Sequence, residues 1–160
     1  MIISNTTPIS NFIQLERFEI LSNLFSTIFI PRAVKQEIDD YFYMNDVWRE
    51  ALSSNFVEVV PIENTSLVSE LNRSLHLGES ETICLCIERN VDLCLLDDKD
   101  ARNVAELYKI PVTGTLGILL QSKRKGLIIK IKPIMDELRN RHQFWISDPM
   151  YRKVLNLASE

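Results

Sequence analysis

The stretch LGESETICLCIERNVDLCLLDDKDARNVAELYKIPVT, residues 77–113, decides the fold. Apolar residues follow helical spacing over 79–89, and the short apolar run 92–96 leads into two aspartates, as a buried strand does. A second helical stretch follows at 101–108 and a second short strand at 110–113. This alternation of helices and short strands predicts βαβ units and a parallel sheet.

The same alternation continues on both sides of this stretch. Upstream we expect strands at 1–4, 27–30 and 56–60, and helices at about 9–24, 32–40, 47–52 and 67–75, with Gly78 as a break before the next helix. Downstream we expect helices at 116–125, 133–141 and 149–157. The chain has no internal repeat and no Gly- or Ser-rich linker. We therefore predict one α/β domain over residues 1–160, with a mostly parallel, twisted sheet.

The composition excludes several classes of protein. Of the 160 residues, 46% are hydrophobic and 25% are charged, and no apolar run is long enough to span a bilayer. The first residues have neither the basic start nor the long apolar stretch of a signal peptide, so we expect a cytoplasmic protein without a membrane partner. Cys84, Cys86 and Cys94 lie in apolar stretches without Cys-x-x-Cys spacing. They predict buried thiols rather than a disulfide framework or a zinc site.

Polar side chains gather at one edge of the predicted sheet. In a parallel sheet all strands end at the same edge, and the helix after each strand begins there. One asparagine and two aspartates directly follow strands, namely Asn5, Asp97 and Asp98. Three glutamates lie in the early turns of helices, namely Glu37, Glu79 and Glu81. Glu37 lies about 9 Å along its helix, but its side chain leans back toward the helix start.

Such a gathering of acids predicts a metal site. Clustered carboxylates repel one another unless a cation lies among them. Oxygen ligands without His or Cys suit Mg²⁺ or Mn²⁺ better than zinc. One or two such ions would orient a water for in-line attack on a phosphodiester and stabilise the leaving oxygen. The formal net charge of −4 argues against a nucleic-acid enzyme, and bound cations would offset part of it.

Each acid also has a purely structural interpretation. Glutamates in the first turn of a helix are favoured by the helix dipole, which by itself explains Glu79 and Glu81. Asp97 and Asp98 follow a strand and precede a helix, where Asp is a good N-cap. Glu37 alone is an ordinary solvated helix residue. Only the convergence of all these positions favours a metal site.

Five segments of the chain resemble the PIN-domain family in their order: Ser4–Pro8, Ile30-Pro31-x5-Glu37, Leu77-Gly78-Glu79-x-Glu81, Leu95–Asp98 and Val112–Gly117. With the C-terminal Ile146-Ser147-Asp148-x-x-Tyr151, they most resemble the prokaryotic subgroup related to VapC toxins. The resemblance covers nearly the whole chain. It implies a three-layer α/β/α fold and cleavage of single-stranded RNA with Mg²⁺ or Mn²⁺.

The resemblance also assigns roles to residues. The four catalytic positions fall on Asn5, Glu37, Glu81 and Asp98, and the metal ligands on Glu37, Glu79, Glu81, Asp97 and Asp98. Thr113 and Thr115 match positions near the site, where a hydroxyl can hold a metal-bound water or a phosphate oxygen. Thr6 and Asp100, which lies two residues beyond Asp98, are further supporting residues. Most PIN nucleases have Asp where this chain has Asn5, so we expect weaker metal binding and attenuated activity.

Basic and aromatic stretches have two interpretations each. Lys123, Arg124 and Lys125 either guide RNA to the acids or form a solvated helix end. The aromatic residues at 41–43 and 48 either bind a partner or pack in the core, which we favour. His76 and His142 stand alone and are expected on the surface.

These observations leave two functions open. The first is a metal-dependent endoribonuclease, the toxin of a toxin–antitoxin pair, with single-stranded RNA, a cognate antitoxin protein and a second copy of the chain as partners. The second is a catalytically weak or inactive module that keeps the fold and binds RNA or a partner protein. A receiver domain does not fit, because its acidic pair should follow the first strand. A nucleotide-binding domain lacks its glycine motif.

Overall fold

Five parallel strands form the centre of the computed structural model, which describes residues 1–160. Their order in the sheet is β3-β2-β1-β4-β5, and every neighbouring pair is parallel. The strands are β1 (Ile2–Ser4), β2 (Ile28–Ile30), β3 (Val57–Val59), β4 (Leu93–Leu95) and β5 (Val112–Thr113). The predicted parallel α/β fold is confirmed.

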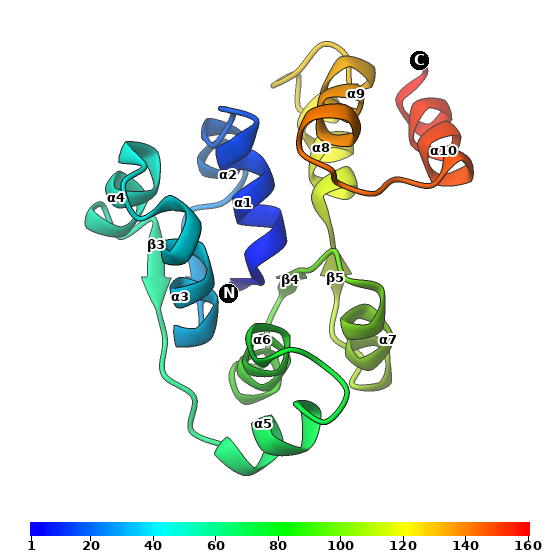
Figure 1. The fold of residues 1–160 in the computed structure, drawn as a ribbon. Helices are drawn as coiled ribbons and strands as arrows, with labels where there is room; N and C mark the ends of the chain where they lie inside the picture. Colours follow the sequence, from blue (N-terminus) through cyan, green and yellow to red (C-terminus); the bar gives the residue numbers. More distant parts are fainter.

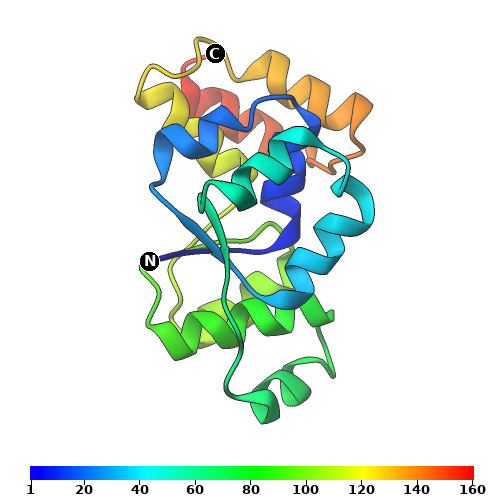
Figure 2. The same ribbon diagram turned by 90° about the vertical axis from the view of Figure 1, so that its left-hand side faces the viewer.

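Ten helices cover the sheet in two layers. They are α1 (Thr6–Gln14), α2 (Glu19–Leu24), α3 (Arg32–Phe42), α4 (Asp46–Ser53), α5 (Thr65–Leu71), α6 (Leu77–Arg89), α7 (Lys99–Leu107), α8 (Thr115–Arg124), α9 (Lys132–Arg141) and α10 (Asp148–Ala158). Helices α5–α7 lie on one side of the sheet, and α1, α2, α4 and α8–α10 lie on the other (Figures 1 and 2). The buried residues of α3 join the core of the second group, and α3 also packs against α6. The molecule therefore has three layers.

Side chains alternate between two cores because successive residues of a strand point to opposite faces. Leu95 of β4 belongs to the larger core, under α1–α4 and α8–α10, and its neighbours Cys94 and Leu96 belong to the smaller one, under α5–α7. Ile28 and Ile30 of β2 join the larger core, whereas Phe29 between them packs against the smaller one. This two-sided burial explains why β2 and β4 are continuous apolar runs.

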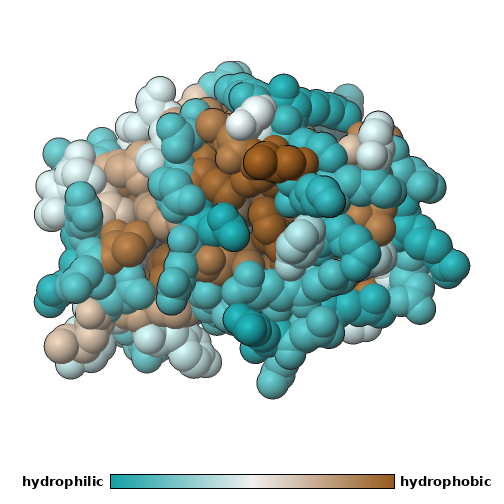
Figure 3. Space-filling model, turned by 90° about the horizontal axis from the view of Figure 1, so that it is seen from above, coloured by the Kyte–Doolittle hydropathy of each residue, from teal (hydrophilic) through white to brown (hydrophobic).

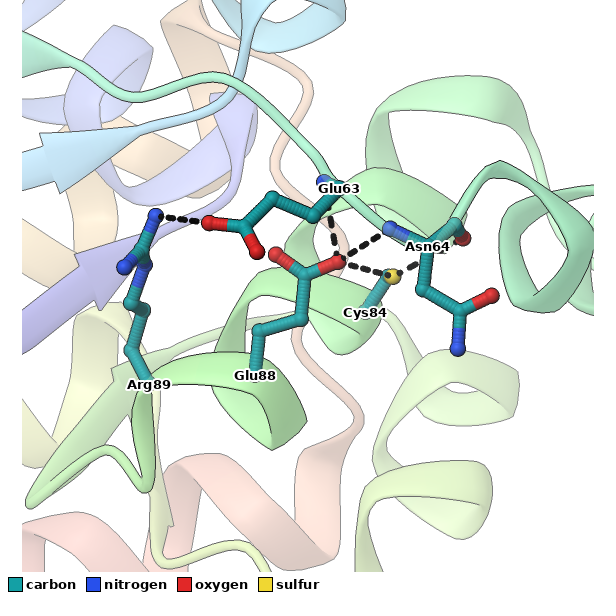
Figure 4. Close-up of polar contacts among 5 residues, drawn as sticks. All are labelled: Glu63, Asn64, Cys84, Glu88 and Arg89. Carbon is teal, nitrogen blue, oxygen red and sulfur yellow. Dashed lines mark hydrogen bonds and ion pairs between the residues drawn. The ribbon is translucent and has the colours of Figure 1, made fainter.

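The three cysteines are buried and free, as predicted. Burial, and then the neighbouring Glu88 carboxylate, raise the pKa of the Cys84 thiol to about 12, so this thiol is not a nucleophile at neutral pH. The Glu88 carboxylate accepts hydrogen bonds from the backbone N–H groups of Glu63 and Asn64 at 3.1 and 2.7 Å. Together with the Arg89–Glu63 ion pair, these contacts attach the segment before α5 to α6 (Figure 4).

The outer face of the larger helical layer is mostly hydrophilic, with a hydrophobic patch near its middle (Figure 3). The loop between α8 and α9, at the top of Figure 1, includes the strongly exposed Ile129. No helix of the chain is both long and apolar enough to cross a bilayer.

Two details differ from the sequence-based expectation. Gly78 does not break the chain but lies inside α6, which begins at Leu77. Glu81 consequently lies in the second turn of α6 and only Glu79 in the first. A Cβ at position 78 would lie 2.4 Å from a Glu37 carboxylate oxygen, so any side chain there must displace the end of the Glu37 side chain.

Candidate functional site

The strand order reverses between β1 and β4, and this reversal locates the site. From β1 the chain moves outward through β2 to β3, and then returns to the other side of β1 as β4. The crevice beyond the carboxyl ends of two such strands is where open α/β sheets bind ligands. Asn5 follows β1 and Asp97 and Asp98 follow β4 here, and the Asn5 N–H donates to the Leu95 carbonyl at 2.9 Å.

Helices α3 and α6 meet beside this crevice and bring glutamates to it. The Thr6 hydroxyl at the start of α1 donates to the Glu37 carboxylate of α3, which lies directly over Gly78 of α6. In the opposite direction, Glu81 of α6 accepts the backbone N–H of Ala33 in α3 at 2.8 Å. Both carboxylates are half-buried; that of Glu81 links α6 to α3, and that of Glu37 links α3 to α1.

The pKa of Glu79 reflects the acids that lie near it. Its carboxylate accepts the His76 backbone N–H at 3.0 Å, which satisfies one free amide at the start of α6. Burial raises the pKa of Glu79, this hydrogen bond opposes the shift, and the negative charges of Asp98 and Glu37 raise the pKa further. The Glu79 carboxylate of α6 is therefore close enough to Glu37 of α3 and Asp98 after β4 to be repelled by their charges.

Asp97 is fixed beside the first turn of α8. Its two oxygens accept hydrogen bonds from the Thr115 backbone N–H at 2.8 Å and the Thr115 hydroxyl at 2.6 Å. That hydroxyl also accepts from the Asn11 side chain of α1 at 2.9 Å. Burial raises the pKa of Asp97, while the Thr115 hydrogen bonds and the Arg102 charge lower it. Thr115 is fully buried, so it positions Asp97 and does not present a hydroxyl to a ligand.

The remaining supporting positions are more exposed. Asp98 is the N-cap of α7 and accepts the Ala101 N–H at 2.9 Å through one oxygen, which bears out the capping interpretation and leaves its other oxygen at the exposed edge. Asp100 lies exposed in the first turn of α7. Thr113 is half-buried, and its hydroxyl fills the space over Gly117.

We call Asn5, Glu37, Glu79, Glu81, Asp97 and Asp98 the acidic rim. None of its five acids forms an ion pair. The Asn5 side-chain oxygen is buried without any hydrogen-bond partner, which is the one orphaned acceptor of the rim. Buried acceptors normally have a donor or a cation. Repelling carboxylates and an orphaned amide oxygen are the donor chemistry that Mg²⁺ or Mn²⁺ prefers.

The acids are not, however, arranged as a ready-made cage. No group of three or more His, Cys, Asp or Glu side chains in residues 1–160 is placed to hold a metal ion. Glu37, Glu81 and Asp97 each direct at least one oxygen toward a protein donor. The donor set fits a hard divalent cation, and a cation shared by Glu37, Glu81 and Asp98 requires their side chains to turn.

The predicted basic segment lies away from the rim. Lys123 donates to the Ala158 carbonyl and pairs with Glu160, both at 2.7 Å, at the end of α8 opposite Thr115. Arg124 and Lys125 are exposed at that same end. This placement favours the interpretation of residues 123–125 as a helix end over a role in guiding RNA.

The aromatic residues and histidines have mixed positions. Trp48 is fully buried and its indole N–H donates to Asp39 at 2.8 Å, as core packing predicts, whereas Tyr41 is 83% exposed. Tyr43 is also exposed, and Phe42 packs against the larger core. His76 is exposed at the start of α6, and His142 is half-buried after α9.

Sequence reasoning missed three residues that shape the rim. Asn11 lies buried in the middle of α1, Arg102 donates to the Leu96 carbonyl at 3.1 Å, and Gly78 makes room for Glu37. A polar Asn on the buried side of an amphipathic helix was a signal available in the sequence. Arg102 carried no such signal, because its role depends on where β4 ends.

Comparison with known proteins gives one match. A family model described as a PIN domain matches residues 1–160, the whole chain. No curated protein and no solved structure matches the chain.

Proposed function

The chain belongs to the PIN-domain family, and from the geometry of its rim we propose that it is a divalent-metal-dependent endoribonuclease of single-stranded RNA. PIN domains are generally nucleases and therefore hydrolases. The observation that supports the finer proposal is that Glu37, Glu79 and Asp98 come together from three segments without an ion pair, and that the charges of Asp98 and Glu37 raise the pKa of Glu79. Such an arrangement lowers stability unless a cation compensates it.

The residues of the rim would have two roles, binding the metal ion and positioning its ligands. Asn5, Glu37, Glu81 and Asp98 would hold Mg²⁺ or Mn²⁺, with Glu79 and Asp97 beside them. The bound ion would activate a water and stabilise the leaving oxygen of a phosphodiester. The Thr6 hydroxyl orients the Glu37 carboxylate, the Ala33 N–H orients that of Glu81, and Thr115 holds Asp97. These hydrogen bonds from protein donors would hold the acids in place beside the substrate phosphate.

The test is cleavage of labelled single-stranded RNA by the pure protein in Mg²⁺, in Mn²⁺ and in EDTA. We expect cleavage with either metal, none in EDTA, and a loss of about 100-fold or more in Asp98→Asn. Asp40→Asn, an exposed aspartate near the far end of α3, is the matched control and should cleave far better than Asp98→Asn. A folded wild-type protein that cleaves no RNA with either metal contradicts the proposal.

A second candidate function is a binding module without catalysis. Two observations favour it, namely the neutral Asn5 at the end of β1 and the absence of a preformed group of three acidic ligands. Calorimetric titration with Mn²⁺ separates the candidates, because a module should bind no metal at millimolar concentration. In a nuclease, Asn5→Asp should bind Mn²⁺ about tenfold more tightly and cleave RNA faster.

The biological setting follows from the same proposal. We propose that the nuclease acts as the toxin of a toxin–antitoxin pair, in which a cognate antitoxin protein suppresses cleavage, and that residues 1–160 work as one unit in a homodimer. Expression of wild type should arrest growth of a bacterial host, whereas Asp98→Asn should not. Arrest by both proteins, or by neither, contradicts the toxin assignment.

A further inference from the structure

A groove runs away from the rim along the free edge of β5. It has a volume of about 970 Å³, and its walls come from α7, β5, the start of α8, α10 and the segment before α10. Asp97 and Asp98 line one end of it, so the groove is continuous with the rim. Figure 1 shows α7 and α10 on opposite sides of β5, which is the last strand of the sheet. We call this feature the β5 groove.

The charge of the β5 groove is opposite to that of the protein as a whole. Apart from Asp97 and Asp98 at its end, the groove has one acidic side chain, Glu106, and four basic ones: Lys99, Arg102, Lys109 and Lys153. None of the four forms an ion pair, whereas seven other basic residues of the chain do. On a chain with a net charge of −4, such unpaired cations form a local site for an anion.

A large aromatic side chain lies on the wall of the same groove. Trp145 is 84% exposed, while its neighbours Phe144 and Ile146 pack inward. An indole in contact with water lacks the favourable free energy of burying its apolar surface, and a partner that covers the ring would supply it. Flat aromatic surfaces beside unpaired cations are the combination that binds single-stranded nucleic acids, since bases stack on the ring and phosphates contact the cations.

Two other occupants fit less well. A peptide added as a strand to β5 would find only the two residues Val112 and Thr113, preceded by Pro111, which has no N–H to donate. A second copy of the chain related by a two-fold axis would place the same patch against itself. Lys99, Lys109 and Lys153 would then face like charges.

From charge complementarity and continuity with the rim, we propose that the β5 groove binds one segment of the single-stranded RNA substrate. Trp145 stacks on a base, and Lys99, Lys109 and Lys153 contact phosphates. From Lys99 to Leu107, two residues before Lys109, α7 advances about 12 Å, enough for about three phosphates at the axial spacing of a stacked strand. This assignment rests on the proposed function for its substrate, and it fixes the direction in which the RNA leaves the acids.

The test measures binding without cleavage. The probe is a fluorescein-labelled, unstructured RNA of about 12 nucleotides, and its anisotropy is followed in EDTA at several salt concentrations. We expect Trp145→Ala to bind about 5- to 100-fold more weakly and Trp145→Phe to recover much of the affinity. Lys109→Glu and Lys153→Glu should each bind more weakly with a shallower salt dependence, by roughly one phosphate contact.

Lys125→Glu supplies the matched control, because it makes the same charge change at the far, exposed end of α8. It should bind like wild type. The proposal is overturned if wild type binds no RNA, if folded Trp145→Ala binds like wild type, or if Lys125→Glu is as weak as Lys109→Glu. It is also overturned if Trp145→Ala only converts a dimer to a monomer in light scattering, since the groove is then a protein interface.

The same variants separate this inference from the nuclease proposal. Binding through Trp145 by a protein that never cleaves RNA leaves the groove assigned and refutes the nuclease. Metal-dependent cleavage by Trp145→Ala with an unchanged KM leaves the nuclease and refutes the groove.

Discussion

The acids of the rim form no ion pairs, whereas the acids of the C-terminal helices are all paired. Asp136 lies 2.8 Å from Lys132, Asp148 lies 2.5 Å from Arg139, and Glu160 lies 2.7 Å from Lys123. The pKa values shift accordingly. Hydrogen bonds from Lys132 and from Arg139 lower the pKa of Asp136 and of Asp148 respectively, while burial raises the pKa of Glu79 in the rim.

The direction of each pKa shift indicates which acids stabilise the fold. A carboxylate whose pKa is lowered stabilises the native state above its ordinary pKa, and this contribution is lost as the pH falls. For Glu79 the sign is opposite, because ionisation of a group with a raised pKa destabilises the native state as the pH rises through that value. The C-terminal acids therefore serve stability, and the rim retains repulsion that a bound cation would relieve.

Removing a charge from the rim should have the largest effect. In Glu37→Gln we expect RNA cleavage to fall about 100-fold or more, because a proposed metal ligand loses its charge while its shape stays the same. Stability in EDTA should stay the same or rise, since Glu37 repels Glu79. Gel-based cleavage rates and urea unfolding check both, with the exposed Glu70→Gln as control. Normal cleavage by Glu37→Gln would remove Glu37 from the site.

A substitution at Gly78 should displace the Glu37 carboxylate by steric contact. The new methyl group of Gly78→Ala would occupy the place of the flexible Glu37 carboxylate, so we expect about tenfold slower cleavage. Stability should change by less than about 1 kcal/mol, because alanine is the better helix former.

Gly126→Ala is the matched control for this change and should show the reverse. Its φ of +75° is unfavourable for alanine, although no atom lies within 4 Å of the new Cβ. We expect a loss of about 1 kcal/mol in stability without slower cleavage. Equal cleavage rates for Gly78→Ala and wild type would show that Glu37 need not lie where it does.

Removing a charge from the C-terminal side should have the smallest effect, and only on stability. Burial opposes the shift, but hydrogen bonds from Lys123 and from the backbone N–H groups of Ile131 and Lys132 lower the pKa of Glu160 to about 2. We expect Glu160→Gln to lose about 1 kcal/mol at neutral pH, after allowance for solvent screening.

The pH dependence of this loss is the critical measurement. Unfolding by urea should show the difference between Glu160→Gln and wild type at pH 7, and it should vanish as the pH falls from the ordinary pKa of 4.5 toward 2. Cleavage should be unaffected at pH 7. A difference that persists at pH 2, or a loss of cleavage, would contradict the division between the two regions.

Much of the rim was predictable because it depends on strand ends. Asn5, Asp97 and Asp98 directly follow short apolar runs, so the parallel topology alone puts them at one edge. The helical positions were harder. Gly78 was predicted as a break because glycine usually interrupts helices, and its actual reason is the Glu37 carboxylate above it. Contacts between α3 and α6 leave no periodic signal in either segment.

Local patterns of apolar and polar residues were enough to predict the parallel α/β architecture, the buried thiols and the edge at which the acids gather, and the family resemblance implied the three layers. Only the tertiary structure decided which oxygens are free. The Thr115 N–H donates to the Asp97 carboxylate, the Ala33 N–H donates to the Glu81 carboxylate, and the Asn5 oxygen remains without a donor. Hydrogen-bond partners and unpaired charges depend on side chains that meet from distant segments, and no single segment encodes that meeting.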